Sequence, residues 1–350
     1  MAYTTIDNPE LYFQTVLYTG NGLDNRDITL PGDEDMQPDL VWLKSRNTNN
    51  YNHFWTDSVR GATKYIKSDA TSAENTLSGS VKAFNSDGFR VGTEADVNNN
   101  TTTYVAWNWK AGGSASSNSD GSITSSVSAS TTAGFSIVKY TGTGSDMTVG
   151  HGLNAVPKII IVKALDTSSD PWWTYHASLG NSAKLRLNQT QASQTTSDYI
   201  WNQTDPTSSV FSLDGTNAGA NANGNDFIIY CFAEKKGYSK FGSFVGNANT
   251  NGPFVYTGFR PAWVLIKNSS ANGENWNLFD NKRNGFNGSG EALRPNTNEA
   301  EYDRNVDFLA NGFKVRDSSG EVSGSGNTMV YLAFAESPFV NSNGVPTNAR

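Results

Sequence analysis

The chain has 350 residues, of which 17% are charged and 12% aromatic, and its formal net charge is −7 with a pI near 5.0. This length suits two or three domains. The acidic balance, without a basic stripe, argues against a nucleic-acid binder, and no apolar run approaches the roughly 18 residues of a membrane span. The N-terminus lacks a signal-peptide pattern, so we expect synthesis in a cytoplasm. Cys231 is the only cysteine, so no intrachain disulfide is expected; it should be a small buried apolar side chain.

The first predicted strand covers residues 12–20, where apolar and polar side chains alternate before a Gly-Asn-Gly turn. Residues 135–142 repeat this pattern. We interpret residues 254–258 as a shortened third version. The same alternation at three places is a first sign of internal repetition.

The next element is a proline followed by a run of strand-forming apolar residues, with a lysine six residues after the proline. It occurs at 38–44, 157–163 and 261–267. Proline is tolerated at the start of a strand, and an apolar residue at nearly every position indicates a strand that is covered on both faces. We therefore predict the central core strand of a domain that is present three times.

Further landmarks follow each central strand. A tryptophan with a polar turn comes next, near Trp55, Trp173 and Trp276. Asp-Gly or Asn-Gly then lies between apolar residues, which is a hairpin signal. Each copy closes with a second apolar strand. The hairpins are at 84–89, 211–215 and 308–313, and the closing strands are at 104–109, 227–234 and 329–336.

The predicted fold is all-β, with three tandem antiparallel β-sandwich domains of the jelly-roll, concanavalin-A-like kind. Two core strands per copy, joined by hairpins and turn-rich loops, favour two packed sheets. A short junction between the second and third copies predicts that these two pack closely, with the first farther away. The expected segments are a first sandwich at 1–111, a Gly/Ser/Thr-rich linker at 112–132, further sandwiches at 133–236 and 241–339, and a tail at 340–350. Residues 122–128 of the linker alternate weakly, which leaves open that they pair as an edge strand.

Patterns of catalytic chemistry are weak. The histidines have no zinc spacing, and there is no nucleophile elbow or phosphate-binding loop. Glu299, Glu301 and Asp303 would share one face of an extended strand, as glycoside hydrolysis could use, but the other copies offer no equivalent. We therefore expect no enzyme activity, no cofactor and no catalytic metal. The acidic loop at 33–39 lacks the EF-hand spacing, which leaves open whether it binds a metal ion.

Aromatic residues give the better signal for a binding site. Trp55, Trp173 and Trp276 are interpreted as equivalent core positions, whereas Trp172 has no counterpart and is expected to be exposed. Aromatic faces beside amides and carboxylates suit sugar rings and protein partners alike. The candidate binding residues, in loops that the sheets hold in place, are Trp172, Trp173, Tyr175, His176, Asp170 and Trp276.

Several motifs resemble a known family. They are Tyr12-Phe13-Gln14-Thr15 with Tyr18-Thr19-Gly20-Asn21-Gly22, the run from Phe84 to Phe89, Tyr104 to Ala111, Ala233 to Gly242, and Phe334 to Phe339. The chain resembles a domain of unknown function that recurs in virion proteins of marine tailed bacteriophages, including phages of cyanobacteria. That domain is similar to concanavalin-A-like jelly-roll sandwiches, a class that includes lectins and phage appendage modules. Fold likeness alone does not give function.

The resemblance implies a phage virion structural protein on the particle exterior, of the tail-fibre or baseplate adhesin type, that contacts host surface glycans. The alternative is a capsid decoration or connector protein that binds only other virion proteins. In both cases the expected partners are other virion proteins and further copies of the chain, most simply as a trimer. The expected location is the virion, after synthesis in the host cytoplasm, with no nucleic-acid partner and no membrane insertion.

Overall fold

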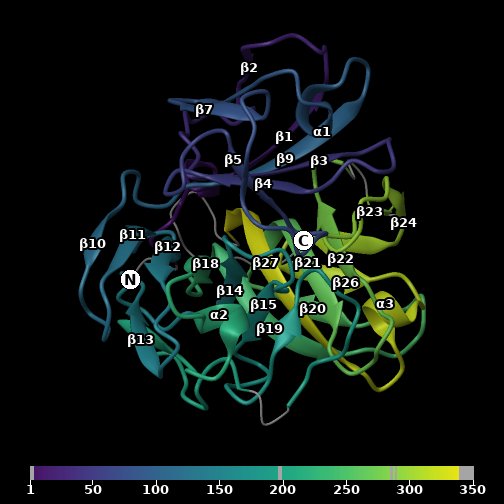
Figure 1. The fold of residues 1–350 in the computed structure, drawn as a ribbon. Coiled ribbons are helices and arrows are strands. Elements are labelled where there is room, and N and C mark those ends of the chain that lie inside the picture. Colours follow the sequence, from purple (N-terminus) through teal and green to yellow (C-terminus); the bar gives the residue numbers. More distant parts are fainter. Residues whose placement is uncertain (1–3, 196–198, 284–286, 288–289, 339–350) are drawn as a thin grey trace.

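The computed structural model describes residues 4–195, 199–283, 287 and 290–338 (Figure 1). It is an all-β protein made of several antiparallel sheets, as expected. Within the described residues, no helix is long and apolar enough to cross a membrane. The helical elements in that part of the chain are short: a 3-10 turn at Pro9–Leu11 and the helices α1 (Ala95–Asn98), α2 (Ala218–Asn221) and α3 (Gly320–Ser323).

Three large sheets share one strand order. In each, the first strand pairs with the closing strand, which pairs with the central strand, which pairs with the strand that follows it. We call these units repeats 1, 2 and 3. Repeat 1 has β1 (Phe13–Thr19), β9 (Thr103–Trp109), β3 (Leu40–Ser45), β4 (Phe54–Asp57), β5 (Lys64–Lys67) and β6 (Asn75–Thr76). Repeat 2 has β10 (Ser116–Asn118), β11 (Ser125–Ser130), β12 (Phe135–Thr141), β18 (Asp226–Phe232), β14 (Ile159–Ala164), β15 (Trp173–His176) and β16 (Leu185–Arg186). Repeat 3 has β19 (Ser239–Val245), β27 (Thr328–Pro338), β21 (Phe259–Asn268) and β22 (Trp276–Asp280).

A small sheet accompanies each large one. Repeat 1 has β2 (Arg26–Ile28), β8 (Gly88–Val91) and β7 (Val81–Asn85), and repeat 2 has β13 (Met147–Gly150) and β17 (Val210–Leu213). Repeat 3 has β20 (Phe254–Tyr256), β26 (Gly312–Val315) and β25 (Val306–Leu309), beside the pair β23 (Glu291–Ala292) and β24 (Tyr302–Asp303). The hairpins expected at 84–89 and 308–313 are confirmed, whereas 211–215 ends a strand that pairs with β13.

The central and closing strands are where the sequence predicts them, and they are buried on both faces. Every residue of β3 and β14 is buried, as are the last eight of β21. The closing strand lies between the first and central strands in all three sheets. Cys231 lies in β18 and is fully buried, as expected of a small apolar side chain.

One face of each large sheet packs into a core that all three repeats share. The aromatic rings of Trp109, Phe232 and Phe334, at matching positions of the closing strands, contact one another. Their centroids lie 6.4 Å (Trp109–Phe232), 5.7 Å (Trp109–Phe334) and 5.7 Å (Phe232–Phe334) apart. Burying each such side chain is worth roughly 1.5–3 kcal/mol, so the shared core is a main source of stability.

The opposite face of each large sheet packs on the small sheet of its own repeat. In repeat 1, Val41 and Leu43 of β3 pack with Phe89 of β8. Repeats 2 and 3 have separate clusters of the same kind. Side chains alternate between the faces of a strand. Each central strand therefore contributes to the core of its own repeat on one face and to the shared core on the other.

Three expectations are therefore wrong. Repeat 1 does not sit apart: Trp55 contacts Trp172 and Tyr230 of repeat 2, and Trp42 contacts Trp263 of repeat 3. Figure 1 shows repeat 1, in purple and blue, seated directly on the other two. The segment 112–132 is not a free linker, because it carries β10 and β11. The edge strand left open for its second half is confirmed, since β11 extends the sheet of repeat 2. The first strand of repeat 3 is β19, whereas residues 254–256 form β20 of its small sheet. The tail expected at 340–350 lies outside the described residues.

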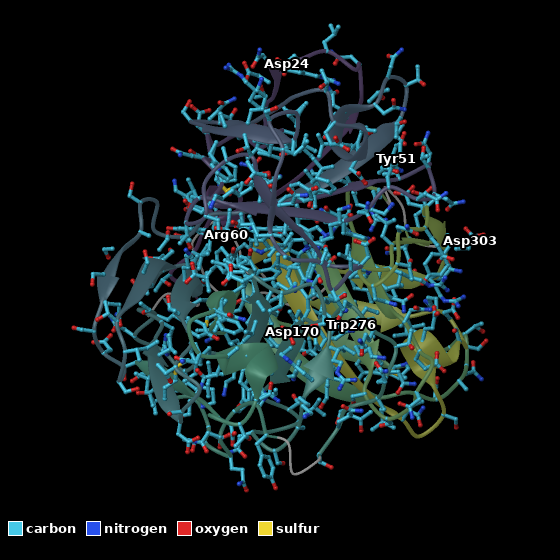
Figure 2. The ribbon with its side chains drawn as sticks, viewed as in Figure 1. Asp24, Tyr51, Arg60, Asp170, Trp276 and Asp303 are labelled. Carbon is cyan, nitrogen blue, oxygen red and sulfur yellow. The ribbon has the colours of Figure 1, made fainter. Side chains whose placement is uncertain are left out.

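A buried ion pair marks two of the three contacts between repeats. Asp57 and Arg60, whose side chains are fully buried, lie 2.5 Å apart, and Asp57 also accepts a hydrogen bond from Tyr230 of repeat 2. Asp280 and Arg283 of repeat 3 repeat this arrangement at 2.6 Å. Figure 2 places Arg60 where the strands of repeat 1 meet those of repeat 2.

The equivalent groups differ in the other contacts. Asp280 accepts from Trp107 Nε1 of repeat 1 at 3.0 Å, so an indole replaces the phenol. In repeat 2 the register places His176 where the other repeats have aspartate, and its Nε2 lies 3.2 Å from the Tyr331 carbonyl oxygen. The three contacts therefore follow one rule. The last residue of β4, β15 or β22 bonds to the closing strand of another repeat: repeat 1 to repeat 2, repeat 2 to repeat 3, and repeat 3 to repeat 1.

Candidate functional site

Exposed aromatic side chains gather on the outer face of the small sheet of repeat 3. Along β20, Val255 points inward and is 7% exposed, whereas Phe254 and Tyr256 point outward and are 45% and 55% exposed. Strand alternation explains this, because residues two apart share a face. The two rings therefore stand on one side of the sheet, in solvent. We call this surface the aromatic face.

The neighbouring strand keeps the aromatic face flat. Gly312 of β26 lies opposite Tyr256, and a Cβ added there would lie 2.0 Å from the Val255 carbonyl oxygen and 3.1 Å from the ring of Phe254. Glycine is therefore required by close approach. Lys314 lies opposite Phe254, and its Nζ donates to the Gly252 carbonyl at 2.7 Å.

A shallow open hollow of about 490 Å³ lies at the far side of this sheet. Arg316 and Asp307, on its wall, form an ion pair at 2.5 Å. Asn287 holds the edge of β25 through two hydrogen bonds with the backbone of Phe308. The wall thus presents amide and guanidinium groups, which suit hydroxyl-rich ligands. Across the sheet, Lys314 of β26 lies between Asp307 of this wall and Phe254 of the aromatic face. Its lining residues are Thr250, Asn287, Asn305, Asp307 and Arg316.

The other repeats do not carry this pair of rings. The strand register places Asp27 and Thr29 of repeat 1, and Thr148 and Gly150 of repeat 2, at the positions of Phe254 and Tyr256. In repeat 1, Asp27 pairs with Arg90 at 2.8 Å across the strands. Two outward aromatics are therefore a property of repeat 3, and the repeated architecture does not require them.

The residues that the sequence suggested for binding lie elsewhere and are buried. Trp172, Trp173, Tyr175, His176 and Trp276 are 0–5% exposed, and Asp170 is half-buried. Trp172 Nε1 donates to the carbonyls of Lys67 and Ala70 in repeat 1, at 2.9 and 3.2 Å. The expected exposure of Trp172 is therefore wrong, because its ring fills the contact between repeats 1 and 2. In Figure 2, Trp276 and Asp170 lie near the middle of the view, below the strands of repeat 1.

The register also corrects the equivalence of the tryptophans. Trp172 lies opposite the lysine of its central strand, and the same place is taken by His53 in repeat 1 and Trp276 in repeat 3. Backbone contacts agree: the amides of His53, Trp172 and Trp276 donate to Asp69, Asn188 and Asn296. Trp55 and Trp173 hold other positions, and Trp173 packs under Lys184 and Arg186.

The lysines near the ends of the three central strands are buried, and two of them, Lys163 and Lys267, join one repeat to another. Lys163 Nζ donates to the carbonyl oxygens of Thr71 in repeat 1 and of Asp170, at 2.9 and 3.2 Å. Lys267 Nζ does the same with Thr190 of repeat 2 and Glu274, at 3.1 and 2.5 Å. Burial lowers the pKa of both lysines, and of Lys44, to about 8. The six-residue spacing from the proline therefore marks a structural contact.

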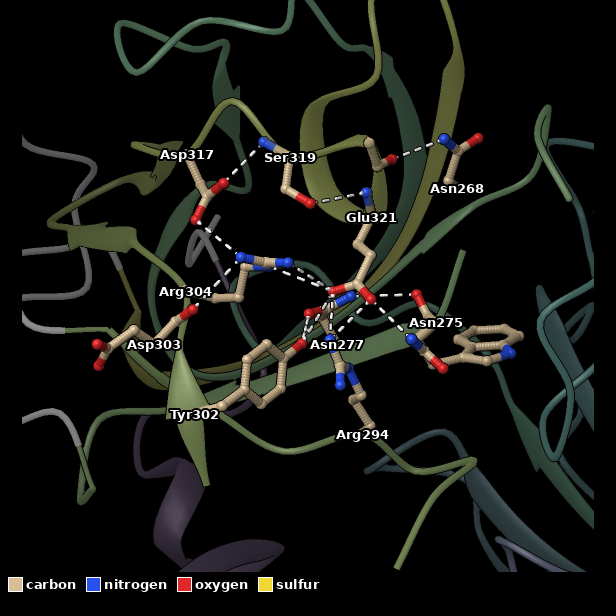
Figure 3. A network of polar contacts seen from close by, with 12 residues as sticks. Asn268, Asn275, Asn277, Arg294, Tyr302, Asp303, Arg304, Asp317, Ser319 and Glu321 are labelled. Carbon is tan, nitrogen blue, oxygen red and sulfur yellow. Dashed lines mark hydrogen bonds and ion pairs between the residues drawn. The ribbon is translucent and has the colours of Figure 1, made fainter. Parts of the chain in front are cut away.

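A polar network around Glu321 occupies the side of repeat 3 (Figure 3). Its carboxylate accepts from Asn275 at 2.7 Å, from Arg294 at 2.9 Å and from Arg304 at 3.1 Å. Burial alone would raise the pKa of Glu321, but these donors outweigh it and hold the pKa below its usual value. The Tyr302 ring lies between the two guanidinium groups, 4.0 Å from that of Arg294 and 5.3 Å from that of Arg304. A carboxylate so engaged is a structural anion.

Two of the three carboxylates suggested for hydrolysis form ion pairs with arginines. Glu299 pairs with Arg294 at 2.8 Å, and Glu301 with Arg46 of repeat 1 at 2.6 Å. Asp303 is exposed and points outward in Figure 3. The three do not converge on one space. In the acidic loop, Asp39 is buried and accepts from Ser58 and from the amides of Ala111 and Gly113. Among the described residues, no group of three His, Cys, Asp or Glu side chains could hold a metal ion.

The sequence pattern did not indicate the aromatic face, because residues 254–258 resemble a shortened first strand of the third copy. The length of this segment is the signal that could have found it: Phe254-Val255-Tyr256 lies between Gly252-Pro253 and Thr257-Gly258, so the strand is too short to cross a core.

No curated protein matches this chain. Residues 8–338 match the model of a family described as "Domain of unknown function (DUF7483)". The matched span includes all three repeats, so the family domain corresponds to the whole three-repeat unit with its shared core. The chain therefore belongs to the DUF7483 family, whose domain has no known function.

Proposed function

We propose that this protein is a structural component of a tailed-phage particle exterior, and that it contacts host surface glycans through the aromatic face of repeat 3. The resemblance to virion proteins of marine phages supports the first part. The observation that carries the second is the exposure of Phe254 and Tyr256 on a sheet whose far side borders a hollow lined by amide and charged groups. We also propose that each repeat is a reduced concanavalin-A-like jelly roll, since a large and a small sheet pack in each.

The chemistry of the site favours binding without cleavage. Aromatic rings contact the C–H faces of sugars, and Asn305 and Arg316 offer groups for hydroxyls. Hydrolysis would need two carboxyls placed on either side of a glycosidic bond. In the aromatic face and its hollow the described carboxyl is Asp307, which pairs with Arg316. The proposal therefore includes no enzymatic step.

The test is a binding screen of the full chain against purified surface polysaccharides of marine bacteria. The wild type should bind at least one of them. The double variant Phe254→Ala/Tyr256→Ala should lose about tenfold or more in affinity, since buried aromatic anchors are worth on the order of 2 kcal/mol at an interface. The matched control is Asp27→Ala, at the equivalent place of repeat 1, which should bind as the wild type does.

Two results would count against this function. One is a wild type that binds no polysaccharide but is retained by purified virion proteins, which would indicate the connector role. The other is polysaccharide binding that the double variant keeps. Release of reducing ends by the wild type, lost in Glu301→Gln, would overturn the proposed absence of hydrolysis.

A further inference from the structure

The first strand of each large sheet has one edge that the closing strand does not pair with. In repeat 2 this edge pairs with an additional strand of the same chain. There, β11 pairs antiparallel with β12 along five residues, from Ser126 opposite Lys139 to Ser130 opposite Phe135. The same segment reaches the small sheet, where Ile123 bridges to Val149 of β13. Residues 116–130 therefore cover the open side of the sandwich, and Val127 is buried there.

The equivalent strand of repeat 3, β19, has no such cover among the described residues: it is the end of its sheet. Ser243 is exposed, and Val245 is 60% exposed. A long edge of this kind is a template for another strand.

The direction of the free hydrogen-bonding groups follows from the ladder with β27. Tyr238 O accepts from Ala335 N at 2.8 Å, and Gly246 N donates to Asn327 O at 3.0 Å. Residues of an antiparallel pair alternate between facing the partner and facing away, so Phe241, Ser243 and Val245 direct their backbone N–H and C=O groups outward. Repeat 2 shows the same alternation. Gly134 O accepts from Ala233 N, just after the closing strand, whereas Ile137 and Lys139 face the other way and lie opposite residues of β11.

The first strand of repeat 1, β1, is also the end of its sheet, and a loop is held against one of its faces. The Gln14 side chain donates to the Glu34 carbonyl at 2.9 Å and accepts from the Gly32 amide at 2.8 Å. Residues 32–34 are thus held beside β1. Of the three equivalent edges, only that of β12 carries a further strand among the described residues, and the edge of β19 ends in the exposed Ser243 and Val245.

We propose that β19 pairs with β19 of a second copy of this chain, antiparallel about a two-fold axis through Ser243. In this register Ser243 lies opposite Ser243 of the second copy, and Phe241 lies opposite its Val245. All of these residues direct their backbone groups outward, so each of the three pairs forms two hydrogen bonds. The edge is therefore complementary to itself.

Side chains agree with this pairing. Phe241 and Val245 share one face of the strand. Phe241 is buried in the shared core, so the exposed Val245 of each copy would lie at the edge of the other copy's core. Lys240 lies opposite Gly246 and Gly242 opposite Phe244, and no like charges face each other. A trimer was expected from the sequence, but strand pairing across a single edge joins two copies and then closes.

The test is the mass of the full chain in solution, by light scattering at about 100 µM, a concentration at which a dimer with a Kd in the micromolar range is formed. A dimer is expected for the wild type, and a monomer for Ser243→Pro. Proline removes an outward N–H that the ladder with β27 does not use, so the fold and its unfolding temperature should be unchanged. Ser243→Thr should remain a dimer.

A matched substitution reports on the register. Lys139→Pro removes the equivalent N–H where β11 uses it, and should lower the stability of the monomer. Amide exchange at Phe241, Ser243 and Val245 should slow as concentration rises, whereas Ile137 and Lys139 should be protected at every concentration. A wild-type monomer or trimer at about 100 µM, or a dimer that Ser243→Pro retains, would overturn the proposal.

Discussion

The phenol of Tyr230 in repeat 2 donates a hydrogen bond of 2.8 Å to the buried carboxylate of Asp57 in repeat 1, which also pairs with Arg60. A buried charge is tolerated only when its hydrogen-bonding capacity is met. The contact between the repeats therefore supplies a group that repeat 1 needs, and the repeats depend on one another for polar contacts as well as for apolar ones.

Removing that donor should destabilise the fold. We expect Tyr230→Phe to lower the free energy of unfolding by about 1–3 kcal/mol, since a hydrogen bond to a buried charged group is lost with almost no change in volume. Urea unfolding monitored by tryptophan fluorescence measures it. Tyr256→Phe, which removes an exposed hydroxyl, is the control and should stay within about 0.5 kcal/mol. Equal stability of the two variants would show that Asp57 does not need this partner.

Trp172→Ala should be among the most damaging single changes. The side chain is fully buried between repeats 1 and 2, so its loss leaves a cavity and the unmet carbonyls of Lys67 and Ala70. A loss of about 3–5 kcal/mol in unfolding free energy is expected. Phe254→Ala, which removes an exposed ring, serves as the comparison and should cost far less. If Trp172→Ala were no more costly than this control, the ring would not be part of the core.

The buried lysines should make stability rise with pH under alkaline conditions. Burial lowers the pKa of Lys163 to about 8 from an ordinary value of 10.5. Between these values the unfolded chain binds more protons than the folded one, so the free energy of unfolding increases with pH. Lys163→Met should reduce that increase. Urea unfolding at pH 8, 9 and 10 measures the slope. Lys282→Met, at an exposed lysine, should leave it unchanged; an identical slope in Lys163→Met would contradict the prediction.

His176 should contribute to acid sensitivity. Its burial lowers its pKa to about 4 from 6.5, with the Tyr331 carbonyl opposing this in part. Between pH 6.5 and 4 the unfolded chain therefore binds the extra proton, and stability falls as pH falls. His176→Asn should show a shallower fall over this window in thermal unfolding scans. A fall as steep as that of the wild type would mean that His176 does not titrate on unfolding.

Much of the fold could be predicted because the repeat has strong local signals. The run from Pro157 to Lys163 and its two relatives are apolar at nearly every position, and the Asp-Gly and Asn-Gly turns are local too. Packing between sheets leaves no such signal. A face rich in tryptophan has the same pattern whether it packs on a sheet of its own domain or on two other repeats, so the common core could not be predicted.

The candidate site was misplaced for a related reason. Matching tryptophan to tryptophan aligned Trp55 with Trp173, whereas the structural equivalents His53, Trp172 and Trp276 each lie nine residues after the lysine of the central strand. Counting from the lysine would have shown that Trp172 has counterparts. The exposure of Phe254 and Tyr256 depends on which strand they join, and three residues between turns do not reveal that.

The triangle of Trp109, Phe232 and Phe334 also sets the order in which the molecule can be completed during synthesis. These rings come from β9, β18 and β27, so the ribosome makes the third about one hundred residues after the second. Until β27 is made, the inward faces of the first two repeats cannot pack against the sheet of repeat 3. The nascent chain must therefore carry exposed tryptophan surfaces for several seconds, at the usual rate of about 5–20 residues per second. Apolar surface exposed in this way promotes aggregation and is bound by chaperones.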